Sequence, residues 1–197
     1  MLNDQKTKTL IADGNTGRFQ LLMELTSDEL LHYALSFVRN QEIAEELVSD
    51  VYVKIWLKRS ELPNIQNIRS YLFIAVKNSC LSHLRKMKNE KIVFIDEYSD
   101  FLFHAVESND DETLEKDLLK KIHTAIDELP PKCKEAFSLA KINGFKHREI
   151  AQIMSISEKT VNNHLVTALK KITESLGIEK KAKTSPLKRA SLFTFTW

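Results

Sequence analysis

The polar face of one predicted helix, over residues 158–175, carries side chains suited to binding nucleic acid. At about 100° per residue, four polar side chains point the same way on this helix: Lys159, Asn163, Thr167 and Lys170. Amides hydrogen-bond to base edges in the major groove, and ammonium groups neutralise phosphates. The solvated face of an ordinary helical hairpin has the same composition, so this face alone leaves both interpretations open.

The residues just before this helix supply its context. A short helix is predicted over 147–154, a three-residue break follows at 155–157, and Ser157 is placed to cap the longer helix. Ala151 is small, as a close crossing of the two helices requires. This spacing is typical of a helix-turn-helix and favours DNA binding over a plain hairpin.

The N-terminal part of the chain is also predicted to be helical. Apolar residues recur at i, i+3, i+4, i+7 and i+11 along one stretch: Ala44, Leu47, Val48, Val51 and Ile55. After a break at 62–64, a second pattern starts at Ile68 and continues into the basic stretch 85–88. Further upstream, a short helix through Leu25 is expected, followed by another that Ser27 would cap.

Composition and charge layout indicate two helical units with a linker between them. The chain has only 4 glycines and 4 prolines among 197 residues, too few for the turns of a sandwich or barrel. Formal net charge is +2, but residues 96–117 carry nine acidic side chains and one lysine, whereas 118–197 carry 15 basic and 7 acidic ones. An acidic block repels itself and buries little, which predicts an extended linker.

We therefore predict an all-α fold with two small helical domains. The first covers 15–92 and the second covers 118–176, with an acidic flexible linker over 93–117. The basic and aromatic tail, 177–197, is expected to be disordered. The apolar run 92–95 fits either a strand or a segment docked on the first domain.

Three stretches of the first domain resemble region 2 of a bacterial sigma factor. They lie at 44–56, 68–78 and 81–86 and read AEELVSDVYVKIW, IRSYLFIAVKN and LSHLRK. The second domain, from IDELP at 126–130 through the helix-turn-helix to ALKKI at 168–172, resembles sigma region 4. Together they resemble the two-domain extracytoplasmic-function group (group IV), which lacks the larger regions between them.

The resemblance implies a factor that binds core RNA polymerase, recognises the −35 and −10 promoter elements, helps melt the promoter and initiates transcription. Region 2 would bind polymerase through a polar helix face: Glu46, Ser49, Asp50 and Lys54. It would also read the −10 element, with Asn78 holding a flipped base and with Arg85 and Lys86 on the phosphate backbone. Region 4 would read the −35 element through its second helix: Lys159, Thr160, Asn162, Asn163 and Lys170. Lys146 and Arg148 would contact phosphates.

Two positions depart from the family pattern, and one polar face has a second interpretation. Ser82 stands where aspartate is usual, and Ser155 stands where the turn usually has glycine, so a left-handed residue there would be mildly strained. The face around Asp50 and Lys54 also fits plain solvent exposure, with these two charges paired at i, i+4.

The partners and location follow from the resemblance and from what the sequence lacks. The group is commonly regulated by an anti-sigma factor, often membrane-bound, and no direct membrane insertion of this chain is expected. No uncharged stretch is long enough to span a bilayer and the N-terminus does not resemble a signal peptide, which predicts a cytoplasmic protein. No cofactor, metal or catalytic residue is expected, because Cys80 and Cys133 fit buried thiols and because His83 and His164 stand alone.

Two other function classes are alternatives to a sigma factor. A stand-alone helix-turn-helix transcriptional regulator would bind duplex DNA without polymerase, and would need neither the polymerase-binding helix at 44–56 nor the acidic linker. An enzyme is disfavoured, since the sequence has no glycine-rich nucleotide loop, no catalytic histidine and cysteine signature and no metal-ligand spacing.

Overall fold

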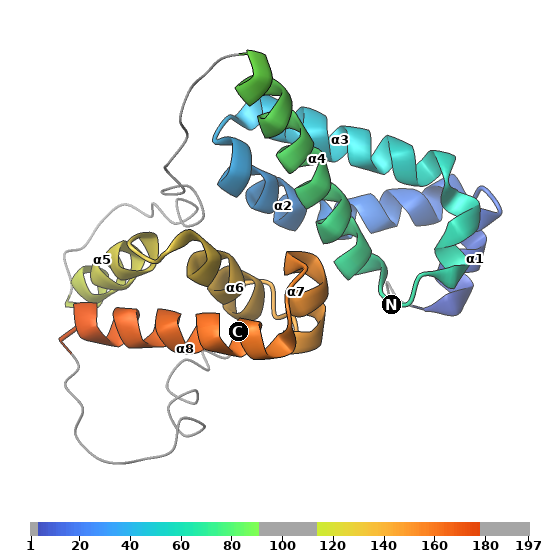
Figure 1. Ribbon diagram of the computed structural model, residues 1–197. Helices are drawn as coiled ribbons and strands as arrows, with labels where there is room; N and C mark the ends of the chain where they lie inside the picture. Colours follow the sequence, from blue (N-terminus) through green and yellow to red (C-terminus); the bar gives the residue numbers. More distant parts are fainter. Residues whose placement is uncertain (1–3, 91–113, 178–197) are drawn as a thin grey trace.

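The computed structural model describes residues 4–90 and 114–177, and every regular element in these two ranges is a helix (Figure 1). The first range contains α1 (Gln5–Ala12), α2 (Thr16–Val38), α3 (Gln41–Leu57), the 3-10 helix η1 (Arg59–Asn64) and α4 (Ile68–Glu90). The second contains α5 (Leu114–Asp127), α6 (Pro131–Lys141), α7 (His147–Met154) and α8 (Glu158–Ser175). The apolar run 92–95, most of the acidic linker and the tail from 178 onward lie outside the described residues.

Helices α2, α3 and α4 pack around one core, which we call the N-terminal unit together with α1 and η1. The apolar stripe predicted on α3 is buried along its whole length, from Ala44 to Ile55. Ile68, Leu72 and Val76 of α4 are fully buried, as their helical spacing predicted. The pairing of α2 with α3 is fixed by a 2.7 Å hydrogen bond between the hydroxyls of Thr26 and Tyr52.

The prediction of two successive helices before residue 40 was wrong, because α2 runs without a break from Thr16 to Val38. Ser27 does not cap a helix; its Oγ donates to the Met23 carbonyl one turn earlier. A mid-helix serine satisfied in this way is compatible with a continuous helix. The true N-cap is Asn15, whose Oδ1 accepts a 3.0 Å hydrogen bond from the amide of Arg18.

Helix α1 was not predicted, and it extends the N-terminal unit beyond the predicted boundary at residue 15. Asp4 caps it by accepting from the amide of Thr7. The helix packs on η1, which contains the predicted break at Pro63. Lys8 is buried there, and its Nζ donates a 2.6 Å hydrogen bond to the carbonyl of Ile65.

Helices α5 to α8 form the C-terminal unit, in which α8 packs on α5, α6 and α7. The predicted helices 147–154 and 158–175 are confirmed at both ends. Pro131 opens α6, and Gly144 ends the following turn with φ +66°, as expected for a left-handed cap. Helix α5 begins at Leu114, four residues before the predicted start at 118 and inside the acidic segment.

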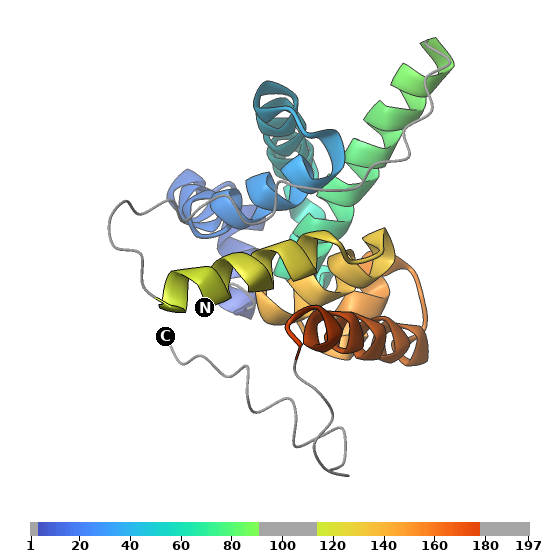
Figure 2. The same cartoon turned by 90° about the vertical axis from the view of Figure 1, so that its left-hand side faces the viewer.

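The two units pack against each other through α4 and α7 (Figure 1). Phe73 of α4 meets Phe145, just before α7, with ring centroids 4.8 Å apart in an edge-to-face arrangement. The C-terminal turns of α4 project away from the rest of the molecule (Figure 2). Helix α4 is therefore buried near its beginning and exposed near its end.

Candidate nucleic-acid interface

The turn between α7 and α8 is built by local hydrogen bonds. Ser155 adopts a left-handed conformation, φ +56°, at the position where glycine is usual in the family. Its conformation lets the amide of Ile156 donate to the carbonyl of Ala151 at 3.0 Å. Ser157 then caps α8, because its Oγ accepts a 3.1 Å hydrogen bond from the amide of Thr160. These hydrogen bonds fix the orientation of α8 relative to α7.

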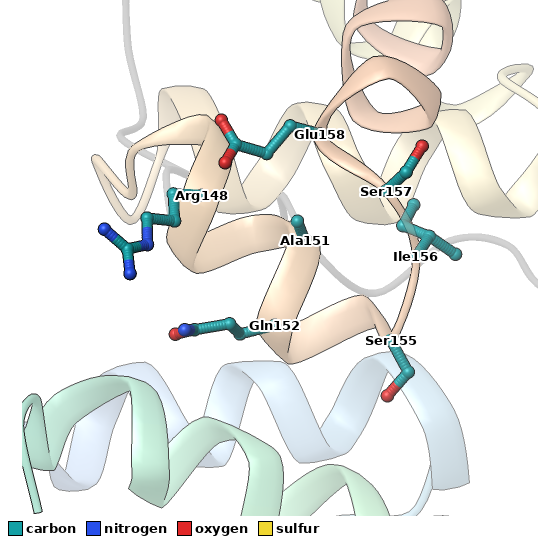
Figure 3. A pocket seen from close by; sticks show the side chains of 7 residues that line it. All are labelled: Arg148, Ala151, Gln152, Ser155, Ile156, Ser157 and Glu158. Atoms are coloured by element: carbon teal, nitrogen blue, oxygen red, sulfur yellow. The ribbon is translucent and has the colours of Figure 1, made fainter.

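A shallow, open pocket of about 500 Å³ lies where α7 meets the start of α8 (Figure 3). It is lined by seven residues: Arg148, Ala151, Gln152, Ser155, Ile156, Ser157 and Glu158. Arg148 and Gln152 extend from the same side of α7 (Figure 3). A guanidinium and an amide on one open concave surface suit contacts to a phosphate or a base edge.

Gln152 and Glu158 were missed in the sequence analysis. Gln152 lies one turn after Arg148, so the i, i+4 spacing was the available signal. Glu158 occupies the first turn of α8, where a carboxylate also interacts favourably with the helix dipole. A carboxylate at this place can accept from the amino group of cytosine and would repel a phosphate.

The residues predicted to read DNA on α8 are on its surface, with one difference between them. Lys159, Asn162, Asn163 and Lys170 are exposed. Thr160 is half-buried, and its hydroxyl lies 2.7 Å from Ser157 Oγ, so its side chain belongs to the cap. Lys170 is about 16 Å further along α8 than Lys159 at 1.5 Å per residue, and it pairs with Glu174 at 3.7 Å. The structure thus separates a group of polar residues at the start of α8 from a cation near its end.

The predicted DNA-binding residues of α4 are exposed too. Asn78 is on the surface directly after the buried Lys77. Arg85 and Lys86 belong to the projecting C-terminal turns. Arg85 donates from Nη2 to Ser82 Oγ at 3.1 Å and from Nε to the Leu81 carbonyl at 3.2 Å. Since Ser82 replaces the usual aspartate, the charge of Arg85 is not neutralised by a carboxylate at this position.

The predicted polymerase-binding face of α3 contains more than polar residues. Glu46, Ser49, Asp50 and Lys54 are all exposed. Lys54 and Asp50 approach to 3.9 Å with both side chains more than half exposed, so their pairing contributes little. Val53 and Leu57 lie at i+3 and i+7 from Asp50 and are 55% and 72% exposed. These two apolar residues share the face with the charges and were not predicted from the sequence.

Both cysteines are buried within the fold, and His164 lies beside one of them. Cys80 and Cys133 are free, buried thiols, as predicted. Burial raises the pKa of Cys80 to about 12, and burial also raises the pKa of Cys133 against the opposing charge of Lys171. His164 Nδ1 lies 3.6 Å from Cys133 Sγ. Over residues 4–90 and 114–177, no three His, Cys, Asp or Glu side chains gather in a way that could hold a metal ion.

None of the helices within residues 4–90 and 114–177 combines the length and the apolar character that crossing a bilayer requires.

A helical unit with an exposed mixed face, followed by a helix-turn-helix unit, defines a two-domain DNA-binding transcription factor. Residues 22–90 match the family model of sigma-70 region 2, and residues 119–172 match that of sigma-70 region 4. The chain belongs to the sigma-70 family, in its extracytoplasmic-function group. It is a sigma factor, which binds core RNA polymerase and directs initiation at promoters.

Curated relatives and solved structures agree with this assignment. The chain is 28% identical over 170 residues to the RNA polymerase sigma factor SigV of Bacillus subtilis, which covers 86% of this chain and 93% of the relative. It is 21% identical over 151 residues to the ECF RNA polymerase sigma factor SigM of the same organism, covering 77% and 90%. The sigma factor RpoE of Bartonella quintana, solved in complex with the anti-sigma factor NepR, has the same fold. Its TM-score is 0.62 at 23% identity, over 82% of this chain and 98% of that one.

Proposed function

We propose that three sets of exposed residues in this sigma factor bind three different targets: the −35 element, the −10 element and core polymerase. The observation that carries the proposal is that all the polar and basic residues predicted to bind DNA, apart from Thr160, are exposed. They lie on α4 of one unit and on α7, its N-cap and α8 of the other. No bond is made or broken by the protein itself. A cytoplasmic location fits this role, since the template and polymerase are there.

The C-terminal unit reads the −35 element in the major groove. Lys159, Asn162 and Asn163 stand at the start of α8, the part of a recognition helix that reaches base edges. Lys146 and Arg148 at the start of α7 bind phosphates. Lys170 contributes a phosphate contact further along, and Thr160 orders the first turn of α8 through its bond to Ser157.

The N-terminal unit reads the −10 element and stabilises the melted strand. Extruding a base costs a few kcal/mol of unstacking, so the protein must offer the base a preformed site. Asn78 supplies polar contacts to that base, and Arg85 and Lys86 follow one strand of the backbone. The projecting end of α4 (Figure 2) gives the strand access from several sides.

The exposed face of α3 binds the clamp helices of the largest polymerase subunit, the docking site that family members use. Its charged residues, Glu46, Asp50 and Lys54, orient the contact. Val53 and Leu57 supply the apolar area, because burying a leucine side chain is worth about 1.5–3 kcal/mol. This combination of an apolar centre with charged neighbours is typical of protein interfaces.

An anti-sigma factor is the proposed regulatory partner. The support is the family assignment and the likeness to a sigma factor that was solved with its anti-sigma factor bound. The identity of such a partner in this case is to be found by co-purification.

Reconstitution with core polymerase tests the function. Purified chain is added to core enzyme on genomic template, and transcripts are sequenced from their 5′ ends. Transcripts that start at positions sharing upstream elements near −35 and −10 are expected. Absence of any start that depends on the added chain, together with tight binding of duplex DNA by the chain alone, would instead indicate a stand-alone regulator.

A further inference from the structure

Val166 of α8 is an apolar side chain that does not belong to the core of the C-terminal unit. It is 52% exposed, whereas Val161, Leu165 and Ile172 of the same helix are buried. Those three lie on the side of α8 that packs on α5, α6 and α7 (Figure 1). Over the described residues of α8, Val166 is the one large apolar side chain that is exposed. Packing within the unit therefore does not account for a valine at this position.

The helical spacing places Val166 among the residues proposed to read the −35 element. At about 100° per residue, it lies roughly 20° around the helix axis from Lys159 and roughly 40° from Asn162 on the other side. Asn163 follows beyond Lys159, roughly 60° from Val166, and all three polar side chains are exposed. The buried Leu165 is roughly 100° away. Val166 thus lies on the face of α8 that would enter the major groove.

The major groove offers an apolar side chain one matching group, the C5-methyl of thymine. The other base-edge groups there are hydrogen-bond donors and acceptors: N7 and O6 of guanine, N7 and the amino group of adenine, the amino group of cytosine and O4 of thymine. Valine has no donor or acceptor, so covering such a group removes its water without replacing the hydrogen bond. Packing on a methyl group instead buries apolar area on both partners, which is favourable. Val166 is therefore suited to thymine and not to cytosine at the same position.

We propose that Val166 is a specificity-determining residue, which packs on the C5-methyl group of one thymine in the −35 element. The inference rests on the proposed function, because it requires the polar face of α8 to lie in the major groove. It adds a base and a chemical group to that function, since the polar residues of the face contact donors, acceptors and phosphates.

The position of this thymine follows from the spacing along α8. Val166 is about 4.5 Å beyond Asn163 at about 1.5 Å per residue, which is close to the rise of about 3.4 Å per base pair. An asparagine side chain pairs best with adenine, through N6 and N7. The thymine is therefore expected within about two base pairs of an adenine that Asn163 reads, on either strand.

The variant Val166→Ala removes the contact and leaves the fold of the C-terminal unit intact. An exposed side chain contributes little to stability, and alanine has a higher helix propensity than valine. Ile142→Ala is the matched control, because Ile142 is 51% exposed in the same unit but is the C-cap of α6, outside α8. Thermal unfolding of the full chain checks that both variants are folded.

The experiment removes one methyl group at a time from the DNA. Each thymine of the −35 element, in a promoter that the reconstituted polymerase holoenzyme uses, is replaced singly by deoxyuridine. Uracil pairs with adenine as thymine does and lacks only the C5-methyl group. Binding of the holoenzyme to each duplex is then measured by fluorescence titration, with the unaltered chain, with Val166→Ala and with Ile142→Ala.

The sensitivity to the methyl group should depend on Val166. We expect one thymine at which deoxyuridine weakens binding of the unaltered holoenzyme about fourfold, which corresponds to about 0.8 kcal/mol for one buried methyl-sized group. With Val166→Ala, the same replacement in the DNA should weaken binding by less than about twofold, because the partner of the methyl group is gone. With Ile142→Ala, the full effect of about fourfold should remain. Uracil also alters base stacking, and the comparison between the chains removes that contribution.

Three results would overturn the proposal. In the first, the −35 element has no thymine on either strand. In the second, no thymine of the element responds to deoxyuridine. In the third, the response is the same with Val166→Ala as with the unaltered chain. The proposed function fails in a different way, because no transcript start would then depend on the added chain, and the inference about Val166 would fail with it.

Discussion

Lys77 of α4 and Glu135 of α6 form an ion pair, with Nζ and Oε1 2.9 Å apart, although 58 residues separate them in the chain. Both side chains are less than a tenth exposed. Desolvation consumes much of the Coulombic attraction of such a pair, whereas removing one partner leaves a buried charge without compensation. Here the remaining charge can return to water if the two units separate, so the pair acts on docking more than on the folding of either unit.

Replacing both members of this pair by apolar residues is expected to be milder than replacing one. Glu135→Leu leaves Lys77 as a buried charge without a carboxylate, whereas Lys77→Met leaves Glu135 with the exposed Lys132 as its cationic partner. The double variant leaves neither buried charge. A double-mutant cycle from urea unfolding of the full chain should give a coupling of about 0.5–3 kcal/mol. The corresponding cycle for the exposed pair Asp50 and Lys54 should stay below about 0.5 kcal/mol. Purely additive losses at Lys77 and Glu135 would contradict this account.

Leu57→Ala is expected to weaken binding to core polymerase without unfolding the protein. The side chain is 72% exposed, so its removal should change the free energy of unfolding by less than about 0.5 kcal/mol. In the complex it loses buried apolar area, which we expect to cost about 1–2 kcal/mol of binding. Titration of labelled core polymerase measures the difference. Leu25→Ala is the control, because Leu25 is 46% exposed but belongs to α2.

Asn163→Ala and Lys146→Ala should affect promoter binding differently. A lost base contact costs about 1–3 kcal/mol on the preferred −35 sequence and relaxes the preference there, whereas a lost phosphate contact weakens binding to all sequences and lowers the salt slope by about 1. Binding of the polymerase holoenzyme to promoters with native and altered −35 elements, at several salt concentrations, separates the two. Lys121→Ala, on the exposed surface of α5, should match the unaltered protein. Equal losses of Asn163→Ala on native and altered elements would argue against a base contact.

The helix-turn-helix was predictable because its signals are local. The Ser157 cap, the turn at 155–157 and the apolar spacing of α8 all lie within about twenty residues, and both helices end where the sequence indicated. The exposure of Lys159 and Asn163 follows from the same periodicity. Such features depend little on the rest of the fold.

The burial of Phe73 and Lys77 was not predictable in this way. They lie beside the apolar stripe of Ile68, Leu72 and Val76, and they are buried because the C-terminal unit covers them. A lysine in a helix is usually exposed, so its type gave no indication of an ion pair with a residue 58 positions away. Ser27 was wrongly predicted to cap a helix, because a serine hydroxyl can either cap a helix or bond to a carbonyl within one.

Two substitutions at left-handed positions of the C-terminal unit should have opposite effects on stability. Ser155 has φ +56°, and Ser155→Gly is expected to stabilise the unit by up to about 1 kcal/mol, because glycine adopts this conformation without strain. Gly144 has φ +66°, and a Cβ added there meets no atom within 4 Å. Gly144→Ala should therefore destabilise by about 1 kcal/mol through conformation alone. Thermal unfolding measures both, and a loss of stability in Ser155→Gly would contradict the assignment of strain.

Alkaline pH should destabilise the protein partly through Cys80. Burial raises the pKa of this thiol from 9.0 to about 12, so the folded state keeps a proton that the unfolded state releases. The contribution of the neutral thiol is complete below pH 9 and decreases as the pH rises toward 12, by at most about 1.4 kcal/mol per pH unit. Urea unfolding is measured at about pH 8.5, 9.5 and 10.5, which are roughly half a unit below, half a unit above and one and a half units above the unfolded pKa of 9.0. The free energy of unfolding should decline more steeply with pH in the native chain than in Cys80→Ala. Burial also raises the pKa of Tyr52, and that contribution remains in both chains. Parallel declines would mean that the Cys80 thiolate is tolerated in the folded state, and that the α4 core is more accessible to water than its burial indicates.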